Sequence, residues 1–81
     1  MRFIWDENKN IENQIKHGIS FEEAISVFDS DFSMSYDAAH STLDEDRYIT
    51  KGMIDHHGII LVVHTEPEEN VYRIISARKH G

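Results

Sequence analysis

DENKNIENQIKHGISFEEAISVF (residues 6–28) is the stretch that decides the fold, because it contains the boundary signals of two successive helices. Asp6 is a suitable N-cap for the first helix, and Gly18 suits its C-terminal cap. These signals predict a helix over residues 7–17. The apolar side chains expected on its buried face, four positions apart, are those of Ile11 and Ile15.

A second helix is predicted directly after the first one. Ser20 and Glu23 have the spacing of a capping box, in which each side chain accepts a hydrogen bond from the other residue's backbone N–H. Apolar residues then recur at helical spacing, namely Phe21, Ala24, Ile25 and Phe28. The polar sequence at residues 29–31 ends this helix.

Beyond residue 31 the hydrophobic period changes to alternation, which is typical of strands. Together with a short apolar run at the N-terminus, the predicted strands are residues 2–5, 32–36, 47–55, 59–64 and 71–78. The continuous β-branched run 59–64 indicates a strand buried on both faces. Residues 37–46 are expected to form a loop, and residues 56–58 a hairpin turn.

This order of elements predicts one α+β domain that comprises residues 1–81. We expect two N-terminal helices packed on one face of a mostly antiparallel sheet of about five strands. The other face of the sheet would remain open and could hold a functional site.

The composition excludes several classes of chemistry. The 81 residues contain no cysteine, so disulfides, thiolate metal sites and a thiol nucleophile are excluded. No stretch approaches the roughly 18 apolar residues of a membrane helix, and we expect a cytoplasmic protein without membrane contact. The net charge of −7 argues against a generally nucleic-acid-binding surface but leaves room for a local basic site.

Cationic side chains are the candidate functional residues. A charge within an apolar strand is costly unless it is paired or faces an open surface, and Arg73 interrupts such a strand. The cations that could converge on the open face are Lys16, His17, Arg47, Lys51, His64, Arg73 and Arg78. Such a cluster binds phosphate or carboxylate well. Strict alternation, however, places Arg73 and Arg78 on opposite faces of the last strand.

Structural explanations compete with this functional one. Lys16 and His17 suit the C-terminal end of a helix, and Arg47 could pair with Glu45 or Asp46. Arg78 could be a solvated residue near the chain end. The aromatic residues expected in the core rather than in a base-stacking site are Phe3, Trp5, Phe21 and Phe28. His40, Asp44, His56 and His57 lack the spacing of metal ligands, and we expect neither a metal nor a cofactor.

Several motifs, spread over nearly the whole chain, occur in the order and spacing of one protein family. They are Phe3-x-Trp5-Asp6-x-x-Lys9, Asn13-x-x-Lys16-His17-Gly18, Glu45-Asp46-Arg47-Tyr48, Leu61-Val62-Val63-His64-Thr65 and Arg73-Ile74-Ile75-Ser76-Ala77-Arg78. This pattern resembles the BrnT family of toxins. The sequence differs from the family pattern in being acidic and in ending at Gly81 without a basic tail.

The resemblance implies a RelE-like fold and a type II toxin that acts as a metal-independent endoribonuclease and inhibits translation. RNA is the implied substrate. The implied partner is a cognate, DNA-binding antitoxin encoded in an adjacent gene, and the toxin would contact DNA only through it. We expect catalytic roles for His17, Arg47, Arg73 and Arg78, and substrate binding by Lys16, Lys51 and His64.

Metal-free cleavage of RNA requires attack of the 2′-hydroxyl on the adjacent phosphorus, with one proton removed and one returned. We expect His17 to carry the proton, while Arg73 and Arg78 bind the scissile phosphate. Two other functions stay open. One is a catalytically inactive toxin-fold module in an antitoxin repressor complex, which the acidic charge favours. The other is an oligomerising domain whose sheet face is an interface.

Overall fold

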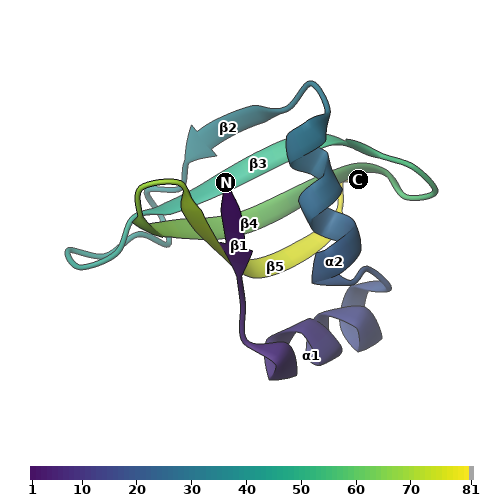
Figure 1. The fold of residues 1–81 in the computed structure, drawn as a ribbon, viewed down its shortest axis with the longest axis horizontal. Coiled ribbons are helices and arrows are strands. Elements are labelled where there is room, and N and C mark those ends of the chain that lie inside the picture. The colour runs from purple at the N-terminus through teal and green to yellow at the C-terminus, as the bar shows by residue number, and fades with distance from the viewer. Residues whose placement is uncertain (81) are drawn as a thin grey trace.

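The structure, a computed structural model, describes residues 1–80 and has an α+β architecture (Figure 1). In chain order its elements are β1 (Arg2–Ile4), α1 (Glu7–His17), α2 (Phe21–Ala24), the 3₁₀ helix η1 (Ile25–Asp29), β2 (Ser33–Tyr36), β3 (Arg47–Ile54), β4 (Gly58–Glu68) and β5 (Val71–Lys79). The predicted α+β class is confirmed, and so, within these 80 residues, is the strand number of about five. None of the helices within residues 1–80 is long and apolar enough to cross a membrane.

The five strands of the described chain form one sheet in the order β1-β5-β4-β3-β2. Strands β2 to β5 are an antiparallel meander, as predicted. β1 instead runs parallel to β5, with Phe3 opposite Tyr72, so the sheet is mixed. The helices connect β1 at one edge of the sheet to β2 at the other edge, which is why the chain must cross a face of the sheet between them (Figure 1).

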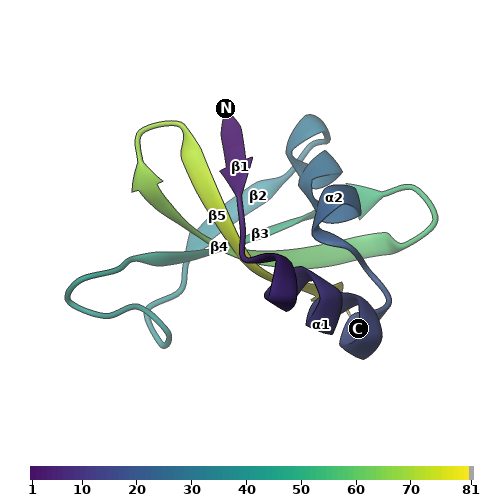
Figure 2. The ribbon, with the colours of Figure 1, turned by 60° about the horizontal axis from the view of Figure 1, so that its bottom comes forward.

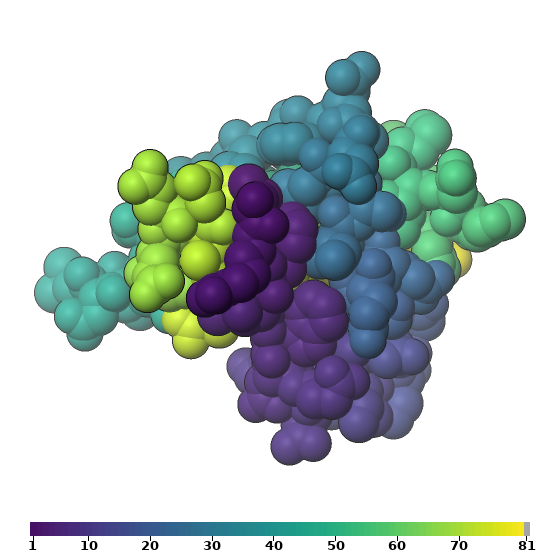
Figure 3. Space-filling model, viewed as in Figure 1, coloured from purple at the N-terminus to yellow at the C-terminus, as the bar shows by residue number. Residues whose placement is uncertain are grey.

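The two helices occupy different places relative to the sheet. The α2–η1 segment crosses one face of the sheet (Figures 1 and 2). α1 instead lies beside the part of β5 that extends beyond its pairing with β1. The expectation that both helices pack on the same face is therefore correct only for α2 and η1. Figure 3 shows the helix-covered face, where the loop of residues 37–46 and the β3–β4 hairpin project at opposite ends of the molecule.

The predicted bounds of α1 are confirmed. The Asp6 carboxylate accepts a hydrogen bond from the Asn8 N–H at 2.8 Å, and Gly18 ends the helix in a left-handed conformation with φ of 71°. The predicted buried face is wrong, because Ile11 is 50% exposed and Ile15 is 83% exposed. The buried side chains of α1 are those of Asn10 and Asn13. Asn13 pairs with the free backbone groups of Ala77 at the edge of β5, whereas Asn10 Oδ1 accepts from the Phe21 N–H at the start of α2. Both amides therefore satisfy backbone groups that an apolar side chain would leave unpaired.

The second helix begins at the predicted capping box. Ser20 Oγ accepts from the Glu23 N–H at 3.0 Å, and the Glu23 carboxylate accepts from the Ser20 N–H at 3.0 Å. Only residues 21–24 are α-helical, and the chain continues as a 3₁₀ helix to Asp29. The expected aromatic residues do contribute to the core, since Phe21 is buried and Phe3, Trp5 and Phe28 pack against the buried cluster.

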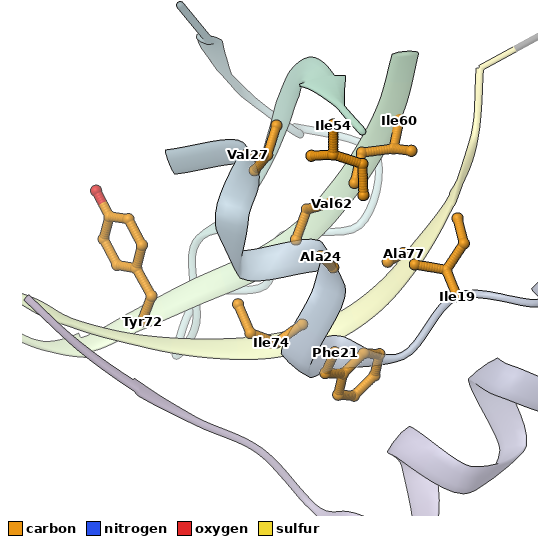
Figure 4. Close-up of a cluster of buried hydrophobic side chains, with 10 residues drawn as sticks. All are labelled: Ile19, Phe21, Ala24, Val27, Ile54, Ile60, Val62, Tyr72, Ile74 and Ala77. Atoms are coloured by element: carbon orange, nitrogen blue, oxygen red, sulfur yellow. The ribbon is translucent and has the colours of Figure 1, made fainter. Parts of the chain in front are cut away.

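The core lies between the α2–η1 segment and one face of β3, β4 and β5 (Figure 4). Its largest apolar side chains are those of Phe21, Ile19, Ile60 and Ile74. Over the predicted residues 59–64, β4 is buried on this face only, because Ile60 and Val62 are inaccessible whereas Leu61 and Val63 are half-buried. The prediction that this strand is buried on both faces is wrong, since neither helix of the described chain covers its other side.

Candidate functional site

Two rows of side chains that contain cations cross β3, β4 and β5 on the open face of the sheet. Residues directly opposite each other in paired strands point to the same face. The first row, near the start of β3, consists of Arg47, Thr65 and Arg73. The second row consists of Lys51, Leu61 and Arg78. Leu61 and Thr65 are four positions apart in β4, so both rows lie on the same face.

A β-bulge in β5 is what brings its two arginines to one face. Val63 pairs with Ser76, but the next residue of β4, His64, pairs with Ile74, so Ile75 is an extra residue in β5. Because of this extra residue, the side chains of Arg73 and Arg78 point to the same face although five positions separate them. The prediction that these two arginines lie on opposite faces is therefore wrong, and four of the predicted cations share the open face.

Glu45 joins the two arginines of the first row. Its Oε1 lies 3.5 Å from Arg47 Nε, and its Oε2 lies 3.4 Å from Arg73 Nη2. Of the two partners suggested for Arg47, Glu45 or Asp46, the structure confirms Glu45, and the same carboxylate also pairs with Arg73 of β5. About a third of each side chain in the Arg47–Glu45 pair is exposed (33% and 35%), so water weakens this contact.

A hollow of about 370 Å³ adjoins this bridge at the end of the sheet from which the 37–46 loop projects. Among the described residues, its wall contains one cation, Arg73, together with Tyr48, Thr65, Pro67 and the carboxylates of Asp44, Glu45, Asp46 and Glu66. Two buried polar atoms at this place, Thr65 Oγ1 and Arg73 Nε, have no hydrogen-bond partner within residues 1–80. Buried polar atoms are normally paired. Four such atoms of the described chain have no partner, and the other two belong to His57 and His64. Of these four residues, only Thr65 and Arg73 line this hollow, where a ligand could pair with them.

The end of α1 lies at the margin of the open face. Lys16 and His17 line a second hollow of about 190 Å³ together with Ser76, whose partner Val63 in β4 points to the open face. Lys16 is exposed and His17 is half-buried. Asn13 anchors this part of the helix, because its amide donates to Ala77 O at 2.9 Å and accepts from the Ala77 N–H at 3.1 Å.

His64 is the one predicted site residue that lies elsewhere. Its ring is buried on the helix-covered face, between the rings of Tyr48 and Tyr72, and its Nε2 shares a hydrogen bond of 2.7 Å with Thr50 Oγ1. Burial lowers the pKa of His64 to about 4, so the imidazole is neutral at physiological pH. This position does not support the predicted contact with substrate.

Three residues of this region were not singled out from the sequence: Glu45 as a bridge, Thr65 and Asn13. The register between β3, β4 and β5 places Thr65 between Arg47 and Arg73 and so brings both arginines within reach of Glu45 in the preceding loop, and no local pattern reveals this register. Asn13 belongs to the Asn-x-x-Lys-His motif, and its position one turn before His17 was the available signal. A buried amide on α1 becomes understandable only when β5 lies beside the helix.

Comparison with known proteins agrees with this geometry. The model of the family described as "Ribonuclease toxin, BrnT, of type II toxin-antitoxin system" matches residues 5–80. Among solved structures, the crystal structure of the Brucella abortus ribonuclease toxin BrnT is similar to this chain, with a TM-score of 0.74 and 27% sequence identity. That similarity covers 100% of this chain and 97% of the Brucella chain. The comparison with curated proteins found no match.

The family match spans nearly all of the chain, and it includes both the Lys-His end of α1 and the arginines of β5. It therefore confirms the resemblance that the motifs indicated. The chain belongs to the BrnT family, the ribonuclease toxins of type II toxin–antitoxin systems, in which an antitoxin protein is the partner of the toxin.

Proposed function

We propose that this chain is a metal-independent endoribonuclease whose active site is the open face of the sheet around Arg47 and Arg73. One observation supports this most strongly. The two guanidinium groups hold the two oxygens of a single carboxylate, at 3.5 Å and 3.4 Å. An arrangement that holds a carboxylate in this way is also suited to a phosphate, because both are anions with several acceptor oxygens.

The proposed reaction is an internal transesterification. The 2′-oxygen bonds to the phosphorus while the bond from phosphorus to the 5′-oxygen breaks, which leaves a 2′,3′-cyclic phosphate and a 5′-hydroxyl. The proton of the 2′-hydroxyl is removed, and a proton is returned to the departing 5′-oxygen. No electrons are exchanged with an outside reagent, so positioning, charge stabilisation and proton transfer are sufficient.

His17 is the proposed proton carrier, since it is the only predicted imidazole at the margin of the open face within the described chain. Arg73 and Arg78 would bind the scissile phosphate and stabilise the charge that develops in the transition state. Arg47 would contact the same phosphate, as it contacts the Glu45 carboxylate together with Arg73, while Lys16 and Lys51 would position the neighbouring backbone phosphates. The bulge in β5 supports this division of roles, because it puts both phosphate-binding arginines on one face.

The proposal also covers how the antitoxin binds, the type of fold and the place where the protein acts. We expect the antitoxin to bind DNA and to neutralise the toxin by covering the cationic rows of the open face. RNA access and antitoxin binding would then exclude each other. We also expect a RelE-like arrangement, action of residues 1–81 as a single domain, and a cytoplasmic site of action, where translation takes place.

The decisive experiment is cleavage of total cellular RNA by the purified chain in the presence of a chelator. The variant Arg73→Ala should cleave about 10²–10³-fold more slowly, because it lacks one charge-stabilising donor. Arg2→Ala is the matched control, since it makes the same charge change at an arginine of β1 whose side chain is 70% exposed. Cyclic-phosphate ends from wild type and Arg2→Ala, but hardly any from a folded Arg73→Ala, would support the proposal.

A catalytically inactive module of the antitoxin complex is the second candidate. The observation in its favour is that Glu45 already occupies both arginines of a chain whose net charge is −7. This candidate predicts a folded chain that binds antitoxin and leaves RNA intact under every metal and salt condition. Cleavage that depends on Arg73 excludes it.

A further inference from the structure

Thr65 is a buried residue of β4 that lies between two arginines of the candidate site. It stands in β4 directly between Arg47 of β3 and Arg73 of β5, in the first row of the open face. Although this face carries no helix within residues 1–80, Thr65 is only 2% exposed. Thr65 also lines the 370 Å³ hollow beside Arg73. Thr65 is therefore a buried hydroxyl in the middle of a cationic row.

The hydroxyl of Thr65 is unpaired, which distinguishes it from the other buried threonine of the sheet. Thr50, on the helix-covered face, shares a hydrogen bond of 2.7 Å with His64. Thr65 Oγ1 has no partner among residues 1–80, and neither does the neighbouring Arg73 Nε. A buried donor without an acceptor destabilises the folded state, so such atoms in a native protein call for a reason.

The geometry of the Glu45 carboxylate explains why these two donors have no acceptor. Its two oxygens are directed to Arg47 Nε and Arg73 Nη2, one oxygen to each arginine. A carboxylate is planar, so it offers no further oxygen out of its plane toward the sheet. A phosphodiester is tetrahedral, and its oxygens point in four directions. A phosphate in this place could therefore contact both arginines and still present an oxygen to the Thr65 hydroxyl.

We propose that Thr65 is a further substrate-binding residue, whose hydroxyl donates a hydrogen bond to the phosphodiester held between Arg47 and Arg73. In the free protein Glu45 takes the place of that phosphate, and the phosphate displaces it when RNA binds. The side chain of Glu45 is 35% exposed and belongs to the loop of residues 37–46, so it can turn away without disturbing a strand. This inference rests on the proposed position of the phosphate.

The test measures binding and cleavage separately. The binding probe is a fluorescent, mixed-sequence 2′-O-methyl RNA, which has no 2′-hydroxyl to attack and therefore cannot be cleaved by the proposed reaction. Thr65→Val removes the hydroxyl and keeps the branched shape, whereas Thr65→Ser keeps the hydroxyl. We expect about tenfold weaker binding for Thr65→Val, because a hydrogen bond to a charged group is lost. Thr65→Ser should stay within about threefold of wild type.

Thr50→Val is the matched control, because it removes the other buried hydroxyl from the opposite face of the same sheet. It should lower the urea midpoint of unfolding, since it leaves His64 Nε2 without its partner, yet it should bind RNA like wild type. Thr65→Val should unfold at the same urea concentration as wild type or a higher one, because it removes an unsatisfied hydroxyl.

Each outcome of these binding and cleavage measurements supports or overturns the role of Thr65. Weaker RNA binding by Thr65→Val, restored in Thr65→Ser, supports the assignment, and it does so even if wild type cleaves no RNA, in which case only the proposed catalysis fails. Equal binding and cleavage by Thr65→Val and wild type would overturn the assignment and leave the ribonuclease proposal intact. Failure of wild type both to bind the probe and to cleave RNA would overturn both proposals.

Discussion

Asn13 and Ala77, 64 positions apart in the sequence, are joined by two hydrogen bonds of 2.9 Å and 3.1 Å. The side-chain amide of Asn13 pairs with both backbone groups of Ala77, as a neighbouring strand would, at the part of the β5 edge that β1 does not reach. A third hydrogen bond, of 2.8 Å, runs from the amide to Ile19 O. Asn13 thus holds α1, with Lys16 and His17, against the strand that carries Arg73 and Arg78.

Replacing Asn13 by alanine should destabilise the protein markedly. The change leaves the N–H and C=O of Ala77 and the C=O of Ile19 without their partner, and each buried unsatisfied group costs about 1–3 kcal/mol. We expect the free energy of unfolding in urea to fall by about 3 kcal/mol. Gln14→Ala in the same helix should change it by less than about 0.5 kcal/mol, because Gln14 is exposed. Similar values for both variants would contradict the proposed anchoring role.

The stability of the protein should fall as the pH drops below 6.5, because His64 is buried as a neutral imidazole with a pKa of about 4. Between pH 6.5 and 4 the unfolded chain binds a proton at this histidine that the folded chain does not bind. The free energy of unfolding should therefore decrease by up to about 1.4 kcal/mol per pH unit over this range. Urea unfolding at pH 7, 6 and 5 measures this slope.

The variant His64→Gln is the control for this slope. It should be less stable than wild type at pH 7 but lose less stability toward pH 5. The carboxylate of Glu23 also makes the stability depend on pH, but at lower pH. The hydrogen bonds from His57 and Ser20 lower its pKa to about 2. Its contribution is lost between pH 4.5 and 2, outside the His64 range. An unchanged slope in His64→Gln would show that another group is responsible.

Removing the charge of Glu45 should strengthen RNA binding. Glu45→Gln keeps the size of the side chain but no longer competes with phosphate for Arg47 and Arg73. We expect about two- to fivefold tighter binding of uncleavable RNA at low salt, which corresponds to a partly exposed ion pair, and a smaller gain as salt is added. Fluorescence anisotropy measures the affinity at low salt and its change as salt is added.

Asp44→Asn makes the same charge change in the same hollow, and within the described residues Asp44 forms no ion pair with an arginine. It should therefore strengthen binding less than Glu45→Gln does. Weaker binding by Glu45→Gln would mean that Glu45 holds the arginines in place for RNA rather than competing with it.

His17 and Lys16 should affect different steps of the reaction, although they are adjacent at the end of α1. His17→Gln should slow cleavage by about 10²–10⁴-fold while binding of uncleavable RNA stays within threefold of wild type, because only the proton transfer is lost. Lys16→Gln should mainly weaken binding. His40→Gln, in the 37–46 loop and with a side chain that is 71% exposed, is the control and should leave both quantities unchanged. Loss of binding in His17→Gln would assign His17 to the phosphate contact instead.

The sequence by itself determined the secondary structure closely. The Asp6 and Gly18 caps and the Ser20–Glu23 capping box define helix ends through contacts within four residues, so they could be recognised without knowledge of the fold. Alternating polarity identified β2 and β3 in the same way, and apolar runs identified β1 and β4, although β4 extends to Glu68, beyond its predicted end at residue 64. The motifs also identified the cationic residues and the family, which the family comparison confirmed.

Only the tertiary structure decided how these cations are arranged. The bulge at Ile75, which places Arg73 and Arg78 on one face, depends on the pairing of β5 with β4. The Arg73–Glu45 contact joins residues 28 positions apart. The contacts of Asn13 with β5 and of Asn10 with the start of α2 explain why α1 buries amides and exposes Ile11 and Ile15. The physical reason is that each of these features depends on a distant segment to supply a neighbour, so a pattern read along the chain contains no signal for it.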